Sequence, residues 1–137
     1  MQAPRIAAGI CCLGLIPLLV GCGDNGRPTV QGVVTLDGKP VENGSIAFKA
    51  VDGKSPTVGA FISGGRFRQQ VPAGSMRVEI TSSGRVGKKK VRSLDGSPIE
   101  IDVLEEQIPE HYNRKSTLVL DVKPGVNQIQ YDLKSTP

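Results

Sequence analysis

The chain has 137 residues, a formal net charge of +4 and 4% aromatic residues. This length allows one domain with a modest core. The small positive charge does not indicate a nucleic-acid partner, and the sequence contains no P-loop, G-x-S-x-G or H-E-x-x-H pattern. We therefore expect neither a nucleic-acid-binding protein nor an enzyme, and we expect no cofactor.

The chain begins with the organisation of a targeting segment. Residues 1–5 carry one positive charge, and residues 6–20 form an apolar run of 15 residues that contains Gly14 and Pro17. A membrane-spanning helix needs about 20 apolar residues. We therefore predict a signal peptide over residues 1–21, followed by a polar tether over residues 22–28 that reaches at most about 25 Å.

Cys22 is the one cysteine outside this targeting segment. Cys11 and Cys12 lie in the apolar run and leave with the signal peptide, so no intrachain disulfide is expected. The single histidine, His111, leaves a metal or nucleophilic role for Cys22 without supporting residues.

The run Leu19-Val20-Gly21-Cys22 resembles the lipobox of bacterial lipoproteins. The resemblance implies transfer of diacylglycerol to the Cys22 thiol, cleavage before Cys22, and acylation, with palmitate-type chains, of the new terminus. Two or more acyl chains anchor a protein stably to a membrane. The expected location is the cell envelope, at the periplasmic or the outer face. The alternative is an ordinary secreted protein that is cleaved nearby and keeps a free thiol.

Residues 29–137 are predicted to form an all-β domain, because short β-rich runs alternate with turn residues. Tight turns are expected at Asp37-Gly38 and at Gly64-Gly65. The pattern favours an antiparallel sandwich. The predicted strands, taken in order, cover residues 29–36, 44–50, 57–63, 66–71, 75–82, 116–122 and 127–133.

The domain resembles the carboxypeptidase-regulatory-like, or transthyretin-like, domain of small bacterial lipoproteins. The motifs that carry this resemblance run from Val30 to Leu133 and are VQGVVTLDGKPVENGSIAF, GGRFRQQVPAGSMRVEI and IPEHYNRKSTLVLDVKPGVNQIQYDL. The resemblance implies a seven-stranded β-sandwich of prealbumin-like topology that serves as an accessory or binding module without catalytic residues. Transthyretin-like hydrolases instead use several histidines and a Y-R-G-S ending, whereas this chain has only His111 and ends in YDLKSTP.

Several residues between Glu100 and Ser116 carry groups capable of chemistry. His111 has Ser116 nearby in sequence, but nothing marks Ser116 as an activated nucleophile. Tyr112 and Asn113 are expected to organise the turn before the strand at Ser116. One helical turn could form over residues 104–107. A set of acidic residues has no calcium-loop spacing and is expected to lie in a solvated loop; its members are Glu100, Asp102, Glu105, Glu106 and Glu110.

The run GRVGKKKVR, residues 84–92, concentrates positive charge. Because it lacks aromatic residues, it does not indicate nucleic-acid binding. It could contact anionic lipid headgroups near the anchor or an acidic envelope polymer. The structural alternative is a solvated loop whose lysines deter sheet pairing. The candidates for contact with an anionic surface are Arg85, Lys88, Lys89, Lys90 and Arg92.

The sequence as a whole predicts a non-catalytic, membrane-anchored lipoprotein whose β-sandwich is a structural or interaction module in the cell envelope. Its expected partners are the membrane, through Cys22, and an envelope protein or polymer. The alternative function is binding of a glycan or a peptide by loops at one end of the sandwich.

Overall fold

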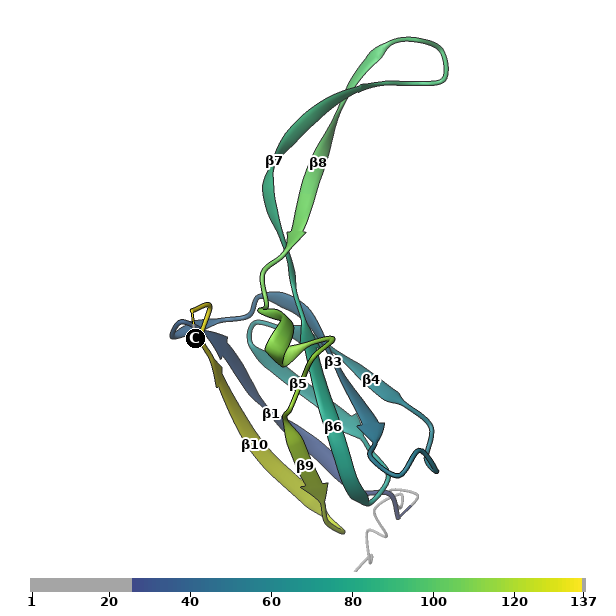
Figure 1. The fold of residues 1–137 in the computed structure, drawn as a ribbon, viewed down its shortest axis with the longest axis vertical. Helices are drawn as coiled ribbons and strands as arrows, with labels where there is room; N and C mark the ends of the chain where they lie inside the picture. Colours follow the sequence, from purple (N-terminus) through teal and green to yellow (C-terminus); the bar gives the residue numbers. More distant parts are fainter. Residues whose placement is uncertain (1–25, 137) are drawn as a thin grey trace, which may run out of the picture.

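The computed structural model describes residues 26–136, and the fold of this part is all-β (Figure 1). Its one other regular element is the short 3-10 helix η1 (Glu110–Tyr112). The strands are β1 (Thr29–Leu36), β2 (Lys39–Pro40), β3 (Asn43–Ala50), β4 (Val58–Ser63), β5 (Arg66–Gln70), β6 (Gly74–Thr81), β7 (Ser83–Arg92), β8 (Pro98–Glu106), β9 (Val119–Val122) and β10 (Val126–Leu133).

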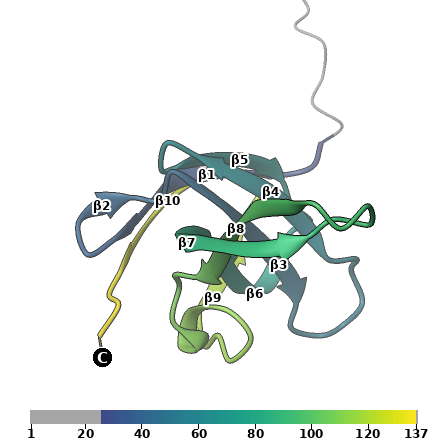
Figure 2. The same ribbon diagram turned by 90° about the horizontal axis from the view of Figure 1, so that it is seen from above.

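One long sheet forms the body of the molecule. Its strand order is β10-β1-β5-β4-β3-β6-β9, with β2 paired to β1, and the sheet curls over on itself (Figure 2). All seven predicted strands are present, and β2, β7 and β8 are additional. The all-β prediction is therefore confirmed, with more strands than expected among the described residues.

One strand pairing departs from the antiparallel expectation. Strand β10 runs parallel to β1, with Thr29 opposite Val126 and Leu36 opposite Leu133. The cause lies in the preceding strand: β9 pairs with β6, and its end, Val122, lies opposite Gly74 at the same end of the sheet where β1 begins. After a short turn, β10 therefore runs back in the direction of β1.

The core lies inside the curl of the sheet. Strand β6 shows the principle, because Met76, Val78 and Ile80 are buried while the residues between them face outward. The rings of Phe48 and Phe67 lie 6.1 Å apart at the centre of the core. Each such side chain contributes about 1.5–3 kcal/mol when fully buried. The other buried apolar residues are Val30, Val34, Val41, Ile46, Ile62, Val71, Ile108, Val122 and Leu133.

Glycine is required at specific points of the body. Gly64 and Gly65 both have positive φ angles, 55° and 75°, which confirms the predicted tight turn between β4 and β5. Gly32 lies opposite Ile129 in the parallel pair. A Cβ atom on Gly32 would lie 1.9 Å from the Ile129 carbonyl oxygen, so no larger residue fits at this position without a backbone shift.

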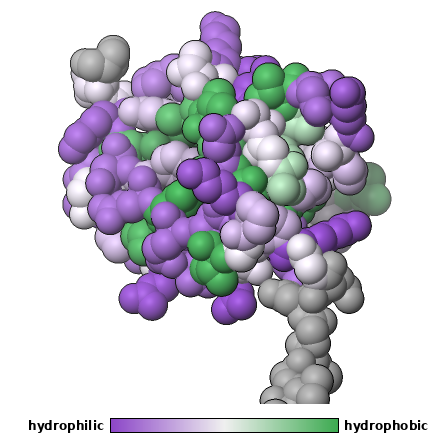
Figure 3. Space-filling view, turned by 90° about the horizontal axis from the view of Figure 1, so that it is seen from below, coloured by the Kyte–Doolittle hydropathy of each residue, from purple (hydrophilic) through white to green (hydrophobic). Residues whose placement is uncertain are grey.

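Strand β1 begins at one end of the body, and the chain leaves the body into β7 at the other end. Thr29 donates its N–H to the Gly125 carbonyl at 2.9 Å, so the described chain begins beside the β9–β10 turn. Strand β6 runs from this end, where Gly74 lies opposite Val122, to the other end, where Thr81 lies opposite Ser45. Strand β7 continues from there away from the body (Figure 1). Seen from the end where the chain begins, hydrophilic and hydrophobic residues are interspersed over the surface (Figure 3).

Candidate functional site: a projecting hairpin arm

Strands β7 and β8 form a long hairpin, residues 83–106, which we call the arm. They pair only with each other, with Ser83 opposite Glu106 at the base and Arg92 opposite Pro98 near the tip. The arm projects beyond the end of the body (Figure 1). Strands of this length span about 30 Å.

The arm corrects two sequence-based expectations. The acidic residues from Glu100 to Glu106 were expected in a solvated loop, and a solvated loop was the structural alternative for the basic run 84–92. Instead, the two segments are the paired strands of one hairpin. The helical turn expected at residues 104–107 is also wrong: strand β8 continues to Glu106, and the 3-10 turn lies farther along, at Glu110–Tyr112. The strands persist because each basic side chain has an acidic or apolar neighbour across the hairpin.

The base of the arm is fixed to the body by a carboxylate. Glu106 accepts the N–H of Ser82 at 2.8 Å and the N–H of Ile108 at 2.9 Å through the same Oε1 atom. The Gln107 N–H donates to the Ser82 carbonyl at 2.7 Å. These bonds hold the entry and the exit of the arm together, and buried Ile108 ties the exit to the core. Glu106 therefore has a structural role.

One face of the arm is charged. Arg85 lies 2.8 Å from Asp102, and Lys88 lies 3.5 Å from Glu100. A β-bulge between Arg85 and Gly87 adds one residue, Val86, to this strand. The extra residue shifts the alternation, so that Arg85 lies on the same face as Lys88 although the two numbers differ by three. The bulge thereby aligns both basic side chains with the carboxylates of β8.

The opposite face of the arm carries an apolar stripe, which consists of Val91, Ile99, Ile101 and Val103. Val91 lies directly opposite Ile99, while Ile101 and Val103 follow at every second position of β8. Ile99 and Ile101 are each 44% exposed, and within residues 26–136 their hairpin pairs with no other strand. Lys89 lies opposite Ile101, in the middle of this stripe, and belongs to no ion pair with a described residue.

The tip of the arm is an ordered turn. The Asp95 carboxylate accepts the Ser97 hydroxyl at 2.6 Å and the Ser97 N–H at 3.0 Å. Both hydrogen bonds stabilise the ionised carboxylate, and they therefore lower the pKa of the Asp95 carboxyl. The bond from the Ser97 hydroxyl has the larger effect. Leu94 beside it is fully exposed.

The residues around His111 have structural roles. The His111 ring lies 4.0 Å from the Tyr112 ring, centroid to centroid. Buried Asn113 donates its side-chain N–H to the Ile108 carbonyl at 3.0 Å, as expected of a residue that organises this turn. The hydrogen bond with Lys115, followed by the nearby charges of Lys115 and Arg114, lowers the pKa of the Glu110 carboxyl. The Ser116 hydroxyl donates to the Val78 carbonyl, so it takes part in the backbone hydrogen bonding of β6.

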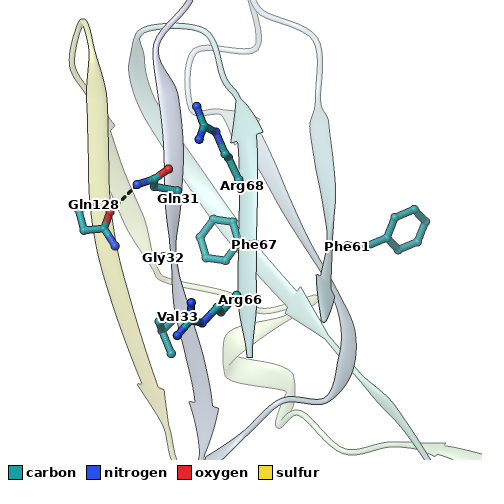
Figure 4. A pocket seen from close by; sticks show the side chains of 8 residues that line it. All are labelled: Gln31, Gly32, Val33, Phe61, Arg66, Phe67, Arg68 and Gln128. Atoms are coloured by element: carbon teal, nitrogen blue, oxygen red, sulfur yellow. Dashed lines mark hydrogen bonds between the residues drawn. The ribbon is translucent and has the colours of Figure 1, made fainter. Parts of the chain in front are cut away.

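A shallow depression of about 590 Å³ lies on the outer face of the body sheet. Its lining includes Arg66 and Arg68 at alternate positions of β5, which form no ion pair with a described residue. Gln31 donates to Gln128 at 2.8 Å across β1 and β10 beside them, and Phe61 points away from the two arginines (Figure 4). Phe61 is 88% exposed.

The arm brings all five predicted basic residues onto one strand, but on different faces. Arg85 and Lys88 are paired on the charged face, whereas Lys89 lies on the apolar stripe. Sequence reasoning missed the stripe, although the alternation in IEIDV could have revealed it. Cys22, the predicted lipidation site, lies outside the described residues.

Within residues 26–136, no cluster of three or more His, Cys, Asp or Glu side chains could hold a metal ion. A search of the same residues for helices long and apolar enough to cross a bilayer finds none. No protein family model, curated protein or solved structure matches this chain.

Proposed function

We propose that this protein is a non-catalytic lipoprotein of the cell envelope, anchored to a membrane through acyl chains on Cys22, which uses the arm to contact another envelope component. The finer fold assignment, a prealbumin-like sandwich of the carboxypeptidase-regulatory-like kind, is part of the same proposal. It is supported by the motifs between Val30 and Leu133 and by the curled all-β body.

The projecting arm is the observation that carries the proposed interaction role. It leaves the body at the end opposite Thr29, the first residue after the predicted tether. A tether of residues 22–28 reaches at most about 25 Å. Anchoring through Cys22 would therefore hold the body close to the membrane and direct the arm away from it.

This orientation bears on the predicted contact of Arg85, Lys88, Lys89, Lys90 and Arg92 with an anionic surface. The contact remains a prediction, and the direction of the arm favours an envelope protein or polymer over the headgroups of the anchoring bilayer. Two of the five residues already have carboxylate partners on β8. Electrostatic attraction to lipid falls off within a Debye length, about 8 Å at physiological ionic strength.

Detergent-phase partitioning tests the anchor. The wild type is expected in the detergent phase, and Cys22→Ala in the aqueous phase if its signal segment is removed, or unprocessed if it is not. Cys12→Ala is the matched control, because it removes a thiol from the same segment and should leave partitioning unchanged. A Cys22→Ala protein that is processed and partitions like the wild type would refute the lipid anchor.

A second candidate function, binding of an anionic glycan, is favoured by the depression on the body sheet. Arg66 and Arg68 lie at alternate positions of β5, about 7 Å apart along the strand, beside the Gln31–Gln128 amide pair. Guanidinium groups match carboxylates and phosphates in shape, and amides suit sugar hydroxyls. An array of uronate- and phosphate-bearing glycans should show binding that Arg66→Gln with Arg68→Gln abolishes; equal binding by both proteins would eliminate this candidate.

A further inference from the structure

The apolar stripe of the arm is an uncovered surface on a hairpin that lacks a third strand. A two-stranded hairpin is marginally stable in water, and three strands or a packed face are needed for independent stability. Here Ile99 and Ile101 remain 44% exposed on strands that pair only with each other. The arm thus exposes apolar surface to water, and contact with a partner would bury this surface.

Lys89 determines what can cover this stripe. It lies between the apolar residues, opposite Ile101, and no described carboxylate pairs with it. Glu105 shares this face but lies four residues from Ile101, the residue opposite Lys89, which is roughly 13 Å along β8. A partner that covers the stripe would bury the Lys89 ammonium, which is unfavourable unless the partner brings a carboxylate.

A second copy of the arm, stacked so that the two stripes cover each other fully, brings no carboxylate to Lys89. In such a two-fold symmetric stack with the arms running in opposite directions, strand β7 of one copy would lie over β7 of the other. The two Lys89 ammonium groups would then approach each other near the symmetry axis. Like charges at the centre of an apolar contact oppose it. The charges on the arm therefore favour a different protein as the occupant.

We propose that the stripe docks a segment of a partner protein in which apolar side chains flank an aspartate or glutamate, and that this carboxylate pairs with Lys89. The proposal rests on the proposed function, since it names the partner class of the arm. Apolar burial against Ile99, Ile101 and the two valines supplies attraction, and the Lys89 pair supplies the register and the selectivity.

The experiment uses an array of random 12-residue peptides, probed with the purified full-length protein in detergent. We expect the wild type to select peptides in which apolar residues surround a single Asp or Glu. Lys89→Glu should weaken binding to these peptides at least about tenfold and should select Lys or Arg at the same position. Lys90→Glu is the matched control, because it makes the same charge change on the neighbouring residue, which faces the charged side.

The possible outcomes separate the proposal from its rivals. If Lys90→Glu shifts the selection as much as Lys89→Glu does, general charge attraction explains binding and the proposal is wrong. It is equally wrong if no apolar-acidic pattern emerges, or if sedimentation shows a wild-type dimer that Ile101→Ser dissociates. Detergent partitioning of the same variants reports on the anchor separately, so a failed anchor and a failed docking site give different results.

Discussion

Removal of the Ser116 hydroxyl is expected to destabilise the body, because this group completes the hydrogen bonding of β6. The pairing of β6 continues past the start of β9, because Val78 donates its N–H at 2.9 Å to the carbonyl of Leu118, the residue before β9. The Val78 carbonyl on the same edge accepts the Ser116 hydroxyl, and this hydroxyl accepts the Leu118 N–H at 3.2 Å. Ser116 and Val78 are both buried, so water cannot replace these bonds readily.

The magnitude follows from the groups left without partners. In Ser116→Ala, the buried Val78 carbonyl and the Leu118 N–H lose a partner, and an unsatisfied buried group costs about 1–3 kcal/mol. For a domain of this size, that corresponds to a fall in Tm of roughly 4–12 °C. Urea and thermal unfolding, followed by circular dichroism, measure both quantities.

Ser63→Ala is the control for this prediction. Ser63 is an exposed residue of β4, so its substitution should change the free energy of unfolding by less than about 0.5 kcal/mol. If Ser116→Ala is as stable as Ser63→Ala, the assignment of the Ser116 hydroxyl as a substitute for a backbone donor is refuted.

Two further predictions concern the body and the arm. Burial raises the pKa of Tyr131 to about 12, so its stabilising contribution is complete below the unfolded value near 10 and is lost as pH rises from 10 towards 12. Tyr131→Phe should lose less stability over this range than the wild type does, and equal losses in urea unfolding would contradict the assignment. Amide exchange should be faster in the middle of β7 and β8 than in β3 and β6, because the arm is a two-stranded hairpin with exposed backbone; equal protection in mass spectrometry would show that the arm is stable alone.

The sequence was sufficient to predict the strands that have one face in the core and the other face in solvent. Met76, Val78 and Ile80 alternate with polar residues because one face of β6 packs in the core. The parallel pairing of β1 with β10 could not be predicted in this way, since the alternation in each strand is compatible with either direction. Only the path of β9 along β6 sets the direction in which β10 returns.

The arm was missed for a different physical reason. Neither of its strands is buried, so both lack the contrast between core and solvent that identifies a strand. The bulge at Val86 also interrupts the alternation of β7, which moves Arg85 onto the charged face. What the sequence contained was the alternation of Ile99, Ile101 and Val103 with acidic residues, beside a turn at Asp95-Gly96.

Site-specific photo-crosslinking in intact cells tests most directly whether the arm is the contact surface of an anchored protein. A photoreactive residue at Ile101 is compared with one at Lys54, an exposed position in the body loop between β3 and β4. The account predicts a discrete crosslinked species from Ile101 in the membrane fraction, absent from Lys54 and lost on Lys89→Glu. The absence of a crosslink at Ile101, or the same crosslinked species from both positions, would contradict it.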